Sequence, residues 1–159
     1  MNNEADKLVT FRLGDDLFAA DIFSVERVLR YTAPTAVPDM PDYIEGVIDY
    51  QQRVVPIVNL RRRFELPRLE ARNETRILIL HGGGEWVGVV VDAVTAVTPF
   101  DPATVAEPPK IFRGLAGEYL KGIVRMGDKL VILLDVERLL SSTERIALER
   151  ANGEVLTNG

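Results

Sequence analysis

The feature of this sequence that most constrains its fold is an internal repeat. Residues 46–64 align without gaps with residues 122–140, and nearly every apolar position in one segment meets an apolar position in the other. Each segment has the pattern of a strand, a turn, a second strand and a short amphipathic helix. Asn59 and Asp135 stand where each helix would begin, and both residue types cap helices well. The repeat therefore predicts that one structural unit occurs twice.

The chain is predicted to be mostly β. Its valines and isoleucines fall in short runs separated by Gly, Asp, Asn and Pro, which is typical of strands joined by tight turns. Two hairpins are predicted, and each is followed by a Val-x-x-Val pattern. The first hairpin covers residues 8–20 with its turn at 14–16, the second covers residues 77–91 with its turn at 81–85, and the paired valines are Val25, Val28, Val94 and Val97.

The length of 159 residues favours a single compact domain. Each half, at about 70 residues, would bury little surface alone, so we expect the two units to share an apolar seam. We predict an all-β fold of two packed β-barrels, with short helical turns and a C-terminal helix that begins at Ser141 and runs through Ala151. The domain is expected to span residues 8–151, with flexible ends at residues 1–7 and 152–159.

Composition excludes several classes of enzyme and ligand. The sequence has no cysteine and one histidine, His81, which excludes disulfides, thiolate catalysis and Cys/His zinc sites. A net charge of −5 without a charged tail argues against nucleic acid and anionic lipid as partners. The polar, acidic N-terminus is unlike a signal peptide, and no apolar run reaches membrane-span length. We expect a cytoplasmic protein without a cofactor or metal.

Residues 81–84, His-Gly-Gly-Gly, are similar to the oxyanion loop of lipases. The sequence has no Gly-x-Ser-x-Gly motif to supply a nucleophile, so a tight hairpin turn is the preferred interpretation. A small hydrolase that uses His81 is the alternative.

Arg53 and the run Arg61–Arg63 form a basic cluster. We interpret it as a solvated helical face that pairs with acidic groups of a partner protein, because the chain as a whole is acidic. The alternative is a nucleic-acid-binding β-barrel, although aromatic residues suited to base stacking are sparse around the cluster.

The four repeated valines also allow two interpretations. They are ordinary core residues at strand ends, or they line an exposed groove between the barrels where a partner docks. The sequence leaves both open.

Five segments occur in an order and spacing shared with a known family. They are residues 8–18, 25–30, 37–48, 53–64 and 89–94. In these segments the chain resembles the CheW family of bacterial chemotaxis coupling proteins. The resemblance implies two intertwined SH3-like five-stranded barrels and a non-enzymatic scaffold. Such a scaffold joins the cytoplasmic tip of methyl-accepting chemoreceptors to the regulatory domain of a CheA-type histidine kinase.

The resemblance further implies recruitment to membrane receptor clusters without membrane insertion, and a monomer that can join rings with kinase domains. Two positions depart from the family pattern. Gln51 replaces an arginine tied to receptor engagement, within residues 49–52, and Arg27 stands where glutamate is common. These departures suggest altered partners, including those of a non-flagellar pathway. The partner-binding residues implied by the resemblance are Val25, Arg27, Val28, Gly46, Gln51, Val94 and Val97.

Overall fold

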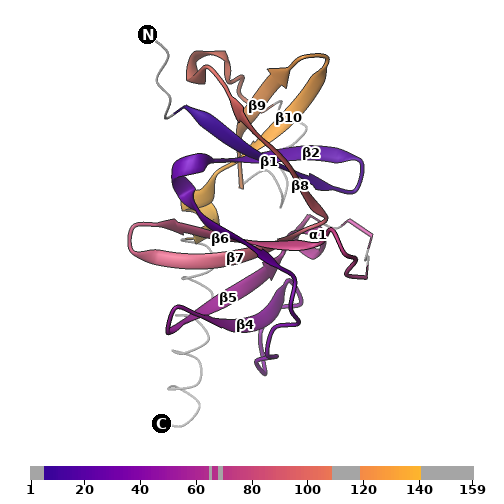
Figure 1. The fold of residues 1–159 in the computed structure, drawn as a ribbon, viewed down its shortest axis with the longest axis vertical. Coiled ribbons are helices and arrows are strands. Elements are labelled where there is room, and N and C mark those ends of the chain that lie inside the picture. The colour runs from indigo at the N-terminus through magenta and orange to yellow at the C-terminus, as the bar shows by residue number, and fades with distance from the viewer. Residues whose placement is uncertain (1–5, 65, 68–69, 109–118, 141–159) are drawn as a thin grey trace.

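The computed structural model describes residues 6–64, 66, 67, 70–108 and 119–140. These residues form two five-stranded sheets with short helices between some of the strands (Figure 1). The first sheet has the order β8-β1-β2-β10-β9, made of β8 (Ala93–Pro99), β1 (Lys7–Leu13), β2 (Asp16–Asp21), β10 (Lys129–Leu134) and β9 (Leu120–Met126). The second sheet has the order β3-β6-β7-β5-β4, made of β3 (Val25–Arg30), β6 (Arg76–Gly82), β7 (Glu85–Val91), β5 (Arg53–Asn59) and β4 (Ile44–Tyr50).

The two halves of the chain exchange strands. The first hairpin, β1 and β2, lies in a sheet with β8, β9 and β10 from the second half, while β6 and β7 lie in a sheet with β3, β4 and β5 from the first half. The halves meet through parallel pairs, β2 with β10 and β5 with β7. The predicted intertwined all-β fold is therefore confirmed.

The registers of the two sheets repeat each other. In the second sheet Val25 pairs with Leu80, and a bulge follows before the ladder resumes. In the first sheet Val94 pairs with Phe11, with a bulge at the matching place. The parallel pairs also correspond, since Ile57 opposes Gly88 just as Leu133 opposes Ala19. The duplication seen in the sequence thus extends to bulges and strand alignment.

The strands of the two hairpins are buried on both faces. On β6, Ile77 and Ile79 belong to a small core inside the second sheet, whereas Leu78 and Leu80 belong to a larger core shared by both sheets. The first sheet has a small core of its own, in which Leu8 takes part. The shared core is the predicted apolar seam.

Local predictions were mostly confirmed, with corrections at both hairpin turns. The predicted turn at 14–16 is one residue too long, because Asp16 begins β2 and pairs with Leu13. Asn59 caps α1 (Leu60–Arg63) through a hydrogen bond from the Arg62 N–H. The predicted turn at 81–85 is too long, because the ladder continues to the pair Gly82 and Glu85. Gly83 and Gly84, both with positive φ, suffice for the two-residue turn.

The predicted helix from Ser141 to Ala151 and the predicted flexible end at residues 152–159 lie outside the described residues. Of the flexible end predicted at residues 1–7, residues 1–5 also lie outside them. The prediction is wrong for Lys7, which begins β1 and pairs with Pro99. Within the described part of the chain, no helix has both the length and the apolar character needed to span a membrane.

Candidate partner-binding surface

Two equivalent edge strands, β3 and β8, carry five of the seven predicted partner-binding residues. Each strand forms one edge of its five-stranded sheet (Figure 1). Each carries one Val-x-x-Val pattern with a bulge inside it. The bulge matters because it adds a residue to the strand and so changes which side chains share a face.

On β3 the bulge places both valines on the face that continues the shared core. Val25 pairs with Leu80 and Val28 pairs with Leu78, and both leucines belong to that core. Val25 is half-buried and packs against the core, whereas Val28 is 41% exposed. The strand therefore extends the apolar core to the molecular surface.

Strand β8 repeats this arrangement. Val94 is half-buried against the shared core, and Val97 is 55% exposed. Each Val-x-x-Val pattern thus contains one residue that packs on the core and one that is exposed. The core interpretation is therefore confirmed for Val25 and Val94, whereas docking at the exposed Val28 and Val97 stays a prediction.

The two edge strands differ in charge. On β3, Arg27 is exposed and makes no ion pair with any described residue, and Arg30 is exposed as well. The Glu26 carboxylate lies 4.0 Å from His81 Nε2. Strand β8 has no charged residue. A partner that contacted both strands would meet an apolar edge on one side and a basic edge on the other.

Gly46 and Gln51 lie apart from these strands, on and beside β4 at the opposite edge of the second sheet. Gly46 is buried with φ of 150°, and a Cβ atom there would lie 2.1 Å from the Thr35 carbonyl oxygen. Gln51 and Gln52 form the turn between β4 and β5, and both have positive φ. The structure therefore divides the predicted residues into two groups.

The hairpin tip beside Gln51 has its own contacts. The Gln51 amide donates a hydrogen bond of 3.3 Å to the hydroxyl of Tyr50. The Arg53 guanidinium lies 4.6 Å from the centre of the Trp86 ring, a cation–π distance. A cation thus remains at this hairpin although Gln51 itself is neutral.

Sequence reasoning missed a salt bridge between Arg61 and Asp92. Two guanidinium nitrogens donate to the Asp92 carboxylate at 2.8 and 2.5 Å, and both side chains are largely buried. The Gly14 N–H donates to the same carboxylate at 2.7 Å. The pair joins α1 to the residue after β7 and to the β1–β2 turn.

These contacts shift the pKa of both partners. Burial alone would raise the pKa of Asp92, but the hydrogen bonds from Arg61 and Gly14 outweigh it and lower that pKa below its usual value. The hydrogen bond to Asp92 raises the pKa of Arg61. The residues are 31 positions apart, and no local pattern announces their pairing.

The prediction that Arg61–Arg63 form a solvated face is wrong. Arg62 donates to the carbonyl oxygen of Asp42, and the Arg63 guanidinium donates to the hydroxyl of Tyr119 at 2.6 Å. Arg63 also lies over the rings of Tyr43 and Tyr119. The three side chains are only partly exposed because they bind groups within the chain, which also removes the basis for a nucleic-acid footprint.

The hydrolase alternative finds no support in the position of His81. This residue lies on β6 beside Trp86, and the polyglycine segment after it forms the turn to β7. Among the described residues, no group of His, Asp and Glu side chains is arranged to hold a metal ion.

Comparisons with known proteins place the chain in a family. A model of the CheW-like domain matches residues 7–144. A chemotaxis protein CheW of Treponema pallidum is 33% identical over 148 residues, covering 91% of this chain and 87% of that protein. A CheW of Klebsiella aerogenes is 33% identical over 138 residues, covering 87% and 83%.

A solved structure supports the same assignment. The scaffolding protein TtCheW from Thermoanaerobacter tengcongensis is 30% identical, with a TM-score of 0.76 over 83% of this chain and 85% of that one. The strand-exchanged fold, the extent of the family match and these relatives lead to one conclusion: the chain belongs to the CheW family.

Proposed function

We propose that this protein is a non-enzymatic scaffold that couples methyl-accepting chemoreceptors to a CheA-type histidine kinase. Membership of the CheW family carries the proposal. The two apolar edge strands support it, because exposed valines that continue a protein core are suited to receive another protein. In this function the protein works by binding and takes part in no chemical step.

The proposed receptor contact is the edge surface, defined as Val25, Val28, Val94 and Val97 with Arg27. The receptor tip is a helical hairpin, and its apolar ridge would lie against Val28 and Val97. Arg27 would meet an acidic or polar group at the rim and so favour one orientation of the helices. Gln51 would act at a second contact, at the β4–β5 hairpin, and Gly46, which is buried under Thr35, would support the shape of that hairpin from within β4.

The first experiment is a calorimetric titration with the regulatory domain of a chemotaxis kinase encoded in the same genome. We expect saturable one-to-one binding in the micromolar range, which corresponds to about 8 kcal/mol. Absence of binding at high protein concentration would count against the coupling function.

The second experiment tests the edge surface with a receptor signalling tip from the same genome. Val28→Asp and Val97→Asp should each weaken binding about tenfold or more, because an apolar contact is replaced by a carboxylate that must lose water. Leu130→Asp is the matched control, since Leu130 is exposed on β10, away from β3, from β8 and from the β4–β5 hairpin. Equal weakening by all three variants would refute the proposed location.

A further inference from the structure

The two halves of this duplicated fold differ sharply at one pair of equivalent places. Each sheet has a pocket beside its parallel strand pair, formed by residues that correspond across the duplication. In the second sheet the pocket has a volume of about 40 Å³, and in the first sheet the equivalent pocket has a volume of about 410 Å³. Since the backbones correspond, the difference comes from side chains and connecting segments.

In the second sheet the chain fills the pocket with its own polar groups. Arg61 lies there and forms its bidentate contact with Asp92. Glu45 accepts hydrogen bonds from the Tyr31 hydroxyl at 3.2 Å and from the Asn59 amide at 2.6 Å. The charged groups of Arg61, Asp92 and Glu45 each have a partner inside the chain. The Arg61 guanidinium is the cation among them.

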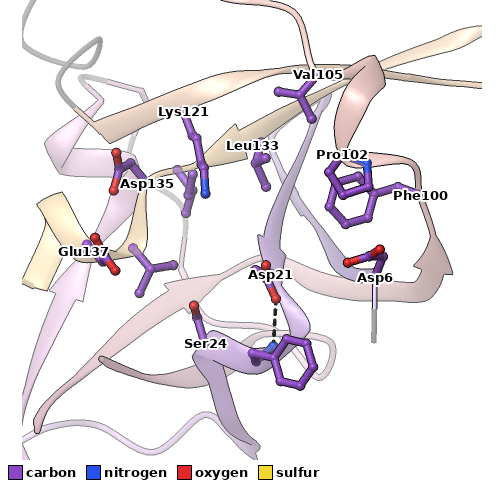
Figure 2. A pocket seen from close by; sticks show the side chains of 13 residues that line it. Asp6, Asp21, Ser24, Phe100, Pro102, Val105, Lys121, Leu133, Asp135 and Glu137 are labelled. Carbon is purple, nitrogen blue, oxygen red and sulfur yellow. Dashed lines mark hydrogen bonds between the residues drawn. The ribbon is translucent and has the colours of Figure 1, made fainter. Parts of the chain in front are cut away.

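In the first sheet the same positions carry different residues, and the pocket is open (Figure 2). Glu137 replaces Arg61, so the arginine is absent, and Phe23 replaces Asp92. The remaining replacements follow the duplication: Phe100 for Tyr31, Lys121 for Glu45, Asp135 for Asn59, Asp6 for Thr75 and Asp21 for Val90.

The open pocket has an acidic rim and an apolar interior. Figure 2 shows Asp135 and Glu137 on one side of the space, Asp6 on the other side and Asp21 between them. Neither Asp6 nor Glu137 has a side-chain hydrogen bond or ion pair with any described residue. The apolar walls come from Val105, Phe100, Pro102 and Leu133, and Phe23 is 64% exposed.

We propose that this pocket binds an arginine side chain of a partner protein. The arginine of one sheet is replaced by Glu137 in the other, and the neutral Thr75, Val90 and Asn59 are replaced by Asp6, Asp21 and Asp135, so the open pocket carries carboxylates that complement a guanidinium. The flat guanidinium can also stack on an aromatic ring such as that of Phe23, which an ammonium does less well. The two halves would then use the same fold position differently, one for an internal arginine and one for an external arginine.

Lys121 is the cation that faces the pocket (Figure 2). It forms no ion pair with the described residues, and its side chain is exposed. In the proposed complex its ammonium donates to a backbone carbonyl oxygen or a carboxylate next to the bound arginine. Four carboxylates line the pocket with this one ammonium. Asp135 already lies 3.6 Å from the Arg138 guanidinium and accepts a hydrogen bond from the Arg138 N–H, but the other three carboxylates still leave the pocket with a negative net charge.

The test uses the full chain and the peptide acetyl-Leu-Arg-Leu-amide, with a citrulline peptide as its neutral counterpart. In ¹⁵N-edited NMR titrations at low salt, we expect amide shifts at Phe23, Ser24 and Lys121. The arginine peptide should bind about fivefold more tightly than the citrulline peptide. High salt should remove most of this difference, because it screens the exposed carboxylates.

Two variants and a control locate the site. Glu137→Gln and Asp21→Asn should each weaken arginine-peptide binding severalfold, and Asn can still accept the capping hydrogen bond that Asp21 accepts from the Phe23 N–H. Glu85→Gln, at an exposed position on β7, should leave binding unchanged.

Two outcomes would overturn the proposal: equal affinity for both peptides, or shifts confined to residues outside the pocket. The titration contains neither receptor nor kinase, so its result is independent of the proposed coupling function.

Discussion

At the scale of single residues, Gly46 shows how the absence of a side chain joins two backbone segments. Thr35 and Val47 form an isolated bridge, with hydrogen bonds of 2.9 Å in both directions. This bridge brings the Thr35 carbonyl group over Gly46. Gly122 has the same role in the first sheet, under Ala106. These glycines are required for close approach within the chain itself.

We predict that Gly46→Ala destabilises the protein by about 2 to 4 kcal/mol, because the new Cβ meets backbone and the positive φ disfavours any side chain. Urea denaturation measures this change. Gly83→Ala is the control, because its φ is also positive but no atom lies within 4 Å of its added Cβ. Gly83→Ala should lower the free energy of unfolding by only about 1 kcal/mol. An equal loss of stability in both variants would contradict the role of the Thr35 contact.

A second residue-scale prediction concerns the β4–β5 turn. Gln52 has φ of 64°, a conformation that favours glycine. Gln52→Gly should raise the free energy of unfolding by about 0.5 to 1 kcal/mol, since relief of strain exceeds the added entropy of the unfolded chain. Chemical denaturation at neutral pH measures this change in the free energy of unfolding. Gly127→Ala, in the equivalent β9–β10 turn with φ of 65°, should have the opposite effect.

At the scale of elements, β3 and β8 combine an exposed edge with a connection to the core. Their bulges place the first valine against the shared core and leave the last valine partly in solvent. An edge strand with exposed valines is prone to unwanted pairing. On β3, charged side chains at Glu26, Arg27 and Arg30 counter this tendency, whereas β8 lacks them.

We predict that Arg27→Glu weakens binding to the native receptor tip about fivefold, because it reverses the charge at the rim of the edge surface. Isothermal titration at two salt concentrations measures the change, and the effect should shrink at high salt. Arg125→Glu, exposed on β9, is the control and should have little effect. Unchanged affinity for the receptor and the kinase after Arg27→Glu would exclude a contact with Arg27.

At the scale of the whole molecule, strand exchange makes each sheet depend on both halves of the chain. The shared core joins them through apolar contacts, and two polar clusters add directional ones. Arg61 and Asp92 link α1 with the β1–β2 turn through Gly14. Arg63 lies against Tyr43, next to β4, and Tyr119, next to β9. We expect the two sheets to unfold together for this reason.

The Arg61–Asp92 pair predicts a dependence of stability on pH. Asp92→Asn should lower the free energy of unfolding by about 3 kcal/mol at neutral pH, because it leaves the largely buried Arg61 without its counter-charge. The pKa of Asp92 is lower in the folded protein, so its stabilising effect is complete above the unfolded-state pKa of about 3.9 and is lost as pH falls through the folded pKa.

Urea denaturation of both proteins from neutral pH down to about pH 3 tests this dependence. The stability difference between the wild type and Asp92→Asn should narrow below about pH 4. A constant difference over the whole range would show that the charge of Asp92 does not stabilise the fold.

What the sequence by itself determined is local or repeated. Alternating apolar residues indicated the hairpins, Asn59 marked the start of α1, and the match between residues 46–64 and 122–140 indicated duplication. These features can be read because strand and helix periodicity and capping depend on neighbours in sequence. The five family-spaced segments then pointed to CheW, and with it to the strand exchange.

Tertiary structure alone decided the contacts between distant segments. It placed Val25 on the core and left Val28 exposed, paired Arg61 with Asp92, and closed one of two equivalent pockets while the other stayed open. None of these follows from a local pattern, because burial and charge pairing depend on which strands meet. In a chain whose halves exchange strands, the neighbours of a side chain come largely from the other half.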